Sequence, residues 1–209
     1  MAKKYLLAAA AGLLMSAAAA NAAPIFTPPA GLTAVGDVTA VYIFADAGDT
    51  SILNELTPSA IAQIFCNHPT GGCAANVPGN QVDLGVQAGP MTFSLANVTT
   101  GSTFTSNTPE SVGGPYHVLV STNYADYGVG ALLPGAQSAI DALIAAGKSI
   151  TYVGWEDLST AQGSDFDYND LIFAFAGTRI SLPEPVTVSL FGAGLAGAAW
   201  MRRRKSKKA

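Results

Sequence analysis

The chain has 209 residues, 49% of them hydrophobic, and a formal net charge of −4. All 14 acidic residues lie between residues 23 and 185, where Lys148 and Arg179 are the only basic residues, so this span carries a net charge of −12. A polyanion of this kind cannot neutralise phosphates, which argues against nucleic-acid binding and makes cations the expected partners.

The N-terminal segment, residues 1–22, has the three parts of a secretory signal peptide. Lys3 and Lys4 form a basic start, an apolar stretch follows, and Ala20 and Ala22 are the small residues of a cleavage site. We expect signal peptidase to cut after Ala22 and the mature chain to be exported.

Residues 23–37 are rich in proline and glycine, which resist helices and central strands, so we expect an irregular lead-in there. The span 38–182 is predicted to be one β-rich extracellular domain, because its apolar runs are short, β-branched or aromatic, and bounded by turn residues. The expected strands are 38–44, 51–56, 81–86, 91–98, 116–122, 150–155 and 171–177. Their spacing predicts a mainly β fold, an antiparallel β-sandwich of jelly-roll-like type.

Two segments depart from the strand pattern. Residues 135–146 place apolar side chains at helical spacing after Pro134 and before Gly147, which predicts an amphipathic helix packed on the strands. A second short helix is expected over residues 58–65.

Cys66 and Cys73 are the only cysteines, and an even pair in an exported protein predicts a disulfide. Two alternatives remain open at this point. One is a metal site formed by Cys66, His68 and Cys73, and the other is a nucleophile in which Cys66 pairs with His117. Oxidising export disfavours both.

An acidic segment precedes the last predicted strand. Its D-x-D-x-N pattern lets alternate oxygen-bearing side chains converge on calcium, a hard cation that takes six to eight oxygen ligands. The carboxylates that follow strand 150–155 complete the site if this strand neighbours strand 171–177. We therefore predict a calcium site. Its ligands are drawn from Glu156, Asp157, Asp165, Asp167, Asn169 and Asp170.

The same pattern allows a plainer interpretation. Asp170 stands where an EF-hand loop needs glycine, and Ala176 stands where it needs a bidentate glutamate, so the segment is not an EF-hand. The alternative is a solvated acidic turn whose Asp and Asn side chains bond their own backbone.

Residues 183–209 combine three features in order. Pro183, Glu184 and Pro185 come first, and an uncharged apolar stretch over 186–201 is predicted to form a transmembrane sorting helix. The helix is followed by a stop-transfer cluster that the positive-inside rule keeps in the cytoplasm. This cluster consists of Arg202, Arg203, Arg204 and Lys205.

This order resembles the PEP-CTERM sorting signal of Gram-negative bacteria. The resemblance implies that an exosortase-type membrane protease recognises the tail and removes it near Pro183–Pro185. The protein would then be anchored transiently in the inner membrane before it reaches the cell surface or the extracellular space.

The segment from Gly154 to Phe175 contains W-E-D-L, then D-x-D-Y-N-D and an apolar strand. It resembles an uncharacterised domain of bacterial secreted and PEP-CTERM proteins. The resemblance implies a compact β-rich domain that binds calcium, and it implies no activity.

The expected function is that of a non-enzymatic, calcium-binding surface or matrix protein associated with exopolysaccharide and biofilm. One alternative is a carbohydrate-binding adhesin, and another is a secreted glycosidase-type hydrolase that uses two carboxyl groups of the acidic segment. No nucleophile elbow, H-E-x-x-H motif or nucleotide-binding loop is present in the sequence, so we do not expect an enzyme. The side chains that could stack on sugar rings are Tyr124, Tyr127, Trp155 and Tyr168.

Overall fold

The computed structural model describes residues 23–181. The predicted signal peptide with its cleavage site, the Pro183–Pro185 motif, the apolar stretch and the basic cluster therefore lie outside the described residues. Among residues 23–181, no helix has the length and apolar character needed to cross a bilayer.

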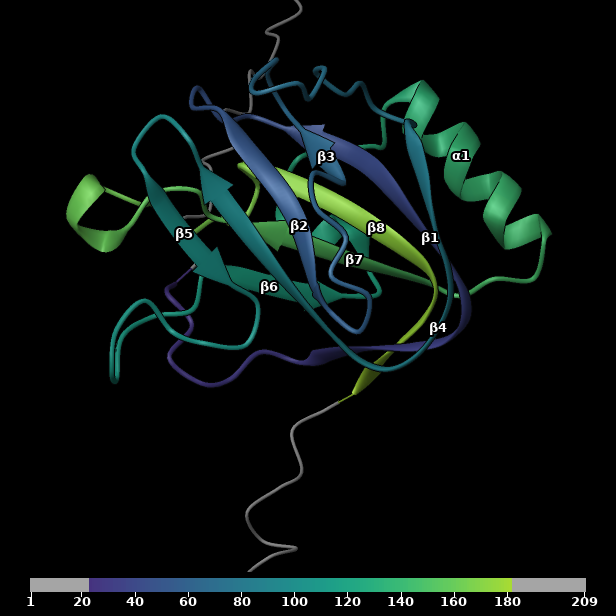
Figure 1. Cartoon of the computed structure of the whole chain (residues 1–209), viewed down its shortest axis with the longest axis horizontal. Helices are drawn as coiled ribbons and strands as arrows, with labels where there is room; N and C mark the ends of the chain where they lie inside the picture. Colours follow the sequence, from purple (N-terminus) through teal and green to yellow (C-terminus); the bar gives the residue numbers. More distant parts are fainter. Residues whose placement is uncertain (1–22, 182–209) are drawn as a thin grey trace, which may run out of the picture.

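Eight strands, one α-helix and two short 3-10 helices make up the described chain (Figure 1). The strands are β1 (Gly31–Ala45), β2 (Ser51–Thr57), β3 (Phe65–Cys66), β4 (Gln81–Asn97), β5 (Ser102–Thr105), β6 (Val118–Ser121), β7 (Ile150–Trp155) and β8 (Leu171–Ser181). The helices are η1 (Tyr124–Tyr127), α1 (Pro134–Ala145) and η2 (Thr160–Gln162).

The strands form one open sheet in the order β3-β2-β4-β1-β8-β7-β6, with β5 paired to β4, and all the pairings are antiparallel. The long strand β4 joins two parts of this sheet, because it pairs with β1 up to Met91 and with β2 from Thr92 onward. In Figure 1, β2, β3 and β5 lie across β6, β7 and β8. The predicted mainly β, antiparallel fold is confirmed, with both parts joined in a single sheet.

The core consists of two clusters on opposite faces of β8. Leu171, Phe173 and Phe175 belong to the first cluster, which also receives side chains from β2, β4 and β5. The intervening residues Ile172 and Ala174 belong to the second cluster, against which α1 packs. Strand β8 is therefore buried on both faces, which explains its nearly continuous apolar sequence.

Helix α1 confirms the prediction for residues 135–146. It begins at Pro134, whose fixed φ suits the first turn of a helix, and it ends at Ala145. Its buried side chains face the second core cluster. They are Ala136, Ala139, Ile140 and Leu143.

The predicted irregular lead-in, residues 23–37, is too long. Strand β1 already begins at Gly31, and its first residues pair with both neighbours, as Leu32 does with Met91 of β4 and Ile180 of β8. The prolines that suggested an irregular segment all precede this strand. Pairing on both sides outweighs the weak local preference of the following residues.

The predicted helix over 58–65 is wrong. Ala60 and Gln63 both have a φ of 54°, in the left-handed region that interrupts a helix. Phe65 then forms part of β3 by pairing with Leu53 of β2. Strand β5 was not predicted, and the predicted strands 81–86 and 91–98 are one strand, β4.

The predicted disulfide between Cys66 and Cys73 is present, with the Cα atoms 6.2 Å apart. It closes the loop that follows β3. Because the two sulfur atoms are bonded to each other, neither the Cys-His metal site nor the cysteine nucleophile is formed. His117 is instead buried against Phe104, with the ring centroids 3.9 Å apart.

Candidate metal centre

The candidate centre forms where β7 ends and β8 begins. These strands are antiparallel neighbours, and Trp155 at the end of β7 pairs with Leu171 at the start of β8. Glu156 therefore emerges beside the loop that leads into β8. The predicted site required the strands that contain residues 150–155 and 171–177 to be neighbours, and they are.

Three of the six predicted ligands converge into one group, which we call the acidic trio: Glu156, Asp165 and Asp167. One carboxylate oxygen from each lies within 4.8 Å of the others. Glu156 is buried, Asp167 is partly buried and Asp165 is exposed. Since calcium–oxygen distances are about 2.3–2.6 Å, ligands on opposite sides of one ion lie about 5 Å apart, so the trio can surround one calcium ion.

An unusual backbone holds the loop in this shape. Phe166 and Tyr168 have φ values of 55° and 58°, a left-handed conformation that costs on the order of 1 kcal/mol or more for such residues. Both rings are buried in the second core cluster, and burial of that apolar area offsets the cost. The alternating conformation directs the aromatic side chains into the core and leaves Asp165 and Asp167 beside Glu156.

Glu156 is held rigidly. It has no solvent exposure, and its carboxylate accepts hydrogen bonds from the Ser164 hydroxyl and from the backbone N–H of Tyr168. These bonds tie the end of β7 to two points of the loop, Ser164 and Tyr168. The residue is thus a structural part of the loop as well as a candidate ligand.

Gly154 makes this arrangement possible, and it is not among the predicted site residues. A β-carbon at this position would overlap the carbonyl oxygen of Tyr168 and the ring of Tyr127. Only glycine lets the loop backbone approach β7 so closely. A glycine two residues before the first acidic residue is the signal that could have indicated this contact.

Asp157 and Asp170 do not join the acidic trio and instead form a neighbouring network. The Asp170 carboxylate accepts from the Asp157 N–H at 2.9 Å, and the Asp157 carboxylate accepts from the Ser51 hydroxyl at 3.0 Å. The Asn97 side chain donates to Asp49 and to the Asp157 carbonyl, both at 2.9 Å. This network ties the acidic segment to β2 and β4.

Asn169 also departs from the predicted ligand set. Its side-chain amide nitrogen donates to the Asp167 carboxylate. Its backbone N–H donates to the same side chain at 3.1 Å. Asn169 therefore orients Asp167, as the turn interpretation expected, and Asp167 still faces the other two members of the trio.

Burial and mutual repulsion raise the pKa values of these carboxyl groups. Burial is the largest cause for Glu156 and Asp167, and repulsion from Asp165 adds to it for both. Burial, together with repulsion from neighbouring carboxylates, raises the pKa of Asp170 to about 8. The pKa of Asp157 is raised by burial and by repulsion from Asp49.

No basic side chain within residues 23–181 is paired with these carboxylates. Lys148 pairs with Asp37 at 2.6 Å, before the start of β7 and away from its acidic end. The other contact between a basic side chain and a carboxylate in the described chain joins His117 and Glu110 at 3.2 Å, and it is an ion pair only when His117 is protonated. The trio thus provides hard oxygen donors without a protein cation, a donor set that suits calcium or magnesium.

The aromatic residues proposed to stack on sugars are mostly core residues. Trp155, Tyr127 and Tyr168 are at most 2% exposed, so no saccharide ring could lie against them. Tyr124 is partly buried and packs against Tyr152, with ring centroids 5.5 Å apart. The adhesin alternative therefore needs a different binding surface.

No protein-family model, curated protein sequence or solved structure matches this chain. The functional proposal therefore rests on the geometry of the site.

Proposed function

We propose that this chain is an exported domain of the bacterial cell surface or extracellular matrix, stabilised by calcium, associated with exopolysaccharide and without catalytic activity. The observation that carries the calcium proposal is the convergence of Glu156, Asp165 and Asp167 within 4.8 Å. Three carboxylates so close together, one of them fully buried, repel one another unless a cation or protons compensate their charge.

The burial of the acidic segment argues against the glycosidase alternative. Glu156 is 0% exposed and Asp157 is 2% exposed, so neither carboxyl group is open to a glycosidic bond. A role in holding a cation needs no such access.

The two parts of the sheet, which β4 joins, also support the finer description of the domain as a jelly-roll-like β-sandwich. The first core cluster receives side chains from both parts of the sheet, as the core of a sandwich does. In this proposal the sandwich is a rigid scaffold, and bound calcium holds the loop between β7 and β8 in one conformation.

Calcium is expected to raise the unfolding temperature of the purified protein. At about 100 times Kd, a ligand that binds only the folded state adds about 2.7 kcal/mol to the free energy of unfolding. Differential scanning fluorimetry in calcium and in EDTA measures the effect. Replacing both Asp165 and Asp167 with asparagine should abolish it, and Asp141→Asn on the exposed surface of α1 is the matched control. An unfolding temperature that calcium does not change would refute the proposal.

The terminal segments support the proposed route to the surface. The basic residues at both ends would remain in the cytoplasm while the acidic middle crosses the membrane. Signal peptidase and an exosortase-type protease would then process the two ends.

Deletion of residues 183–209 is expected to abolish delivery to the cell surface while export across the inner membrane continues. Cell fractionation and surface protease digestion measure both steps. Alanine replacement of Pro183, Glu184 and Pro185 tests the motif alone, since it leaves the apolar stretch intact. If the truncated protein fractionates as the full-length protein does, the sorting role is wrong.

A further inference from the structure

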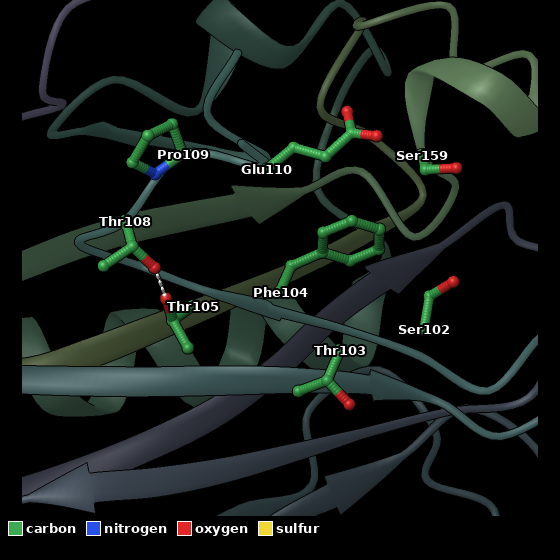
Figure 2. Close-up of a pocket in the computed structure, with 8 residues that line it drawn as sticks. All are labelled: Ser102, Thr103, Phe104, Thr105, Thr108, Pro109, Glu110 and Ser159. Atoms are coloured by element: carbon green, nitrogen blue, oxygen red, sulfur yellow. Dashed lines mark hydrogen bonds between the residues drawn. The ribbon is translucent and has the colours of Figure 1, made fainter. Parts of the chain in front are cut away.

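A pocket of about 420 Å³ opens beside β5, and none of the acidic trio lines it. Its volume lies within the range of roughly 300–1,000 Å³ found for small-molecule sites. Figure 2 shows the Glu110 carboxylate and the Ser159 hydroxyl lying around the Phe104 ring, with Ser102 on the same side of β5. Thr105 and Thr108, which are hydrogen-bonded to each other, line another part. The pocket thus combines one aromatic ring, one carboxylate and several hydroxyl groups.

The Glu110 carboxylate is held in place by one of its two oxygen atoms. Oε2 accepts hydrogen bonds from His117 Nε2 at 3.2 Å, from the Thr160 N–H at 3.2 Å and from the Thr160 hydroxyl at 2.7 Å. Oε1 accepts no hydrogen bond from any residue in the described part of the chain. A fixed carboxylate with one free oxygen is a pre-organised acceptor, which lowers the entropic cost of binding a ligand.

The charge state of Glu110 suits this role. Burial acts to raise its pKa, but the hydrogen bonds from Thr160 and the pair with His117 outweigh burial and lower the pKa. His117 is itself buried, and burial lowers its pKa. Near neutral pH, a neutral His117 therefore donates to an ionised Glu110.

The aromatic ring and Ser159 are also fixed. Phe104 stacks on His117 at an interplanar angle of 18°. Gln162 Oε1 accepts from the Ser159 N–H at 2.8 Å and from the Ser102 hydroxyl at 3.3 Å. One glutamine thus joins β5 to η2. These contacts define the pocket before any ligand arrives.

We propose that this pocket binds one unit of a neutral saccharide, whose hydroxyl groups donate to Glu110 Oε1. Phe104 is only 6% exposed and His117 covers one face of its ring, so it contributes a small apolar part of the pocket floor and the hydroxyl contacts carry the binding. A saccharide presents hydroxyl donors and C–H faces, and hydroxyl side chains along the walls can both donate and accept. Glu110 and the net charge of −12 between residues 23 and 185 repel uronate and sulfated sugars. The inference rests on the proposed association with exopolysaccharide and supplies its binding site.

The test is affinity electrophoresis of the purified full-length protein in gels that contain dextran, galactomannan, xyloglucan or alginate. At least one neutral polysaccharide should retard the protein, and alginate, a polyuronate, should not. Glu110→Ala should weaken that binding by about tenfold or more, because a hydrogen bond to a charged group is lost. Ser102→Leu, which fills the pocket and removes the hydroxyl that donates to Gln162 without changing the charge, should do the same. Asp141→Ala removes one negative charge from α1 and should have less than about a twofold effect.

Several outcomes would overturn the proposal: no retardation by the three neutral polysaccharides, retardation by alginate alone, or equal retardation of Ser102→Leu and the unmodified protein. Circular dichroism checks that both variants are folded. If Glu110→Ala does not fold, Ser102→Leu still tests the proposal. Repeating the gels in calcium and in EDTA separates the two proposals. A calcium effect on unfolding without saccharide binding would reject the pocket alone, and saccharide binding without a calcium effect would reject the metal site alone.

Discussion

Replacement of Glu156 with alanine is expected to destabilise the protein by about 3 kcal/mol in the absence of calcium. Glu156 is fully buried and accepts from Ser164 and Tyr168. Without the carboxylate, the Tyr168 N–H loses its partner in a loop whose backbone is already in a costly conformation. Relief of repulsion from Asp165 and Asp167 offsets part of this loss. Urea denaturation in EDTA measures the change.

Glu156→Gln is the matched control, because glutamine keeps the shape and an acceptor oxygen for Tyr168. We expect it to change the free energy of unfolding by less than about 1 kcal/mol in EDTA, while weakening calcium binding. Asp165→Ala, at an exposed position, should also be nearly neutral in EDTA. If alanine at position 156 is as well tolerated as glutamine, the buried carboxylate does not hold the loop.

The metal-free protein is expected to lose stability as the pH rises from about 5 to about 8. The pKa values of Glu156, Asp157, Asp167 and Asp170 are raised in the folded state, that of Asp170 to about 8. Over this range the folded state retains protons that the unfolded chain has released. The free energy of unfolding therefore falls by up to about 1.4 kcal/mol per pH unit for each group that titrates.

Calcium should remove this loss, because metal ligands bind in their deprotonated form and calcium affinity rises with pH. Thermal unfolding across the pH range, in EDTA and in calcium, measures both profiles. Asp170→Asn should flatten the part of the EDTA profile near pH 8, since the pKa of this carboxyl group is raised to about 8. Glu110 contributes in the opposite direction, because its pKa is lowered, but only below its ordinary pKa near 4.3. Stability in EDTA that rises steadily towards pH 8 would contradict the prediction.

The acidic centre could be predicted from sequence to the extent that it is local. The D-x-D-x-N pattern between two apolar strands indicated the loop, and antiparallel pairing of β7 with β8 brought Glu156 to it. It could not be predicted that Glu156 joins the acidic trio while Asp157 joins the neighbouring hydrogen-bond network. This difference depends on Ser51 and Asn97, which come from β2 and β4 and are distant in the chain.

The same difference between local sequence patterns and contacts of distant residues explains the errors in the predicted fold. Strand β8 and helix α1 were predicted because each has a clear apolar pattern in its own sequence. Strand β5 and the first part of β1 have a less clear pattern, and they are strands because β4 and β8 lie beside them. The saccharide pocket left no signal at all in the sequence, since β5, Glu110 and Ser159 meet only in the folded chain.

The direction of β8 determines where the acidic loop lies relative to the end of the described chain. This strand begins next to the acidic loop at Leu171 and ends at Ser181, so its 11 residues separate the two by roughly 35 Å. In the proposed anchored state, a tether beyond Ser181 would act on a strand that pairs with β7 up to Ala176 and with β1 as far as Ser181. The acidic loop would then lie at the end of β8 farthest from the tether.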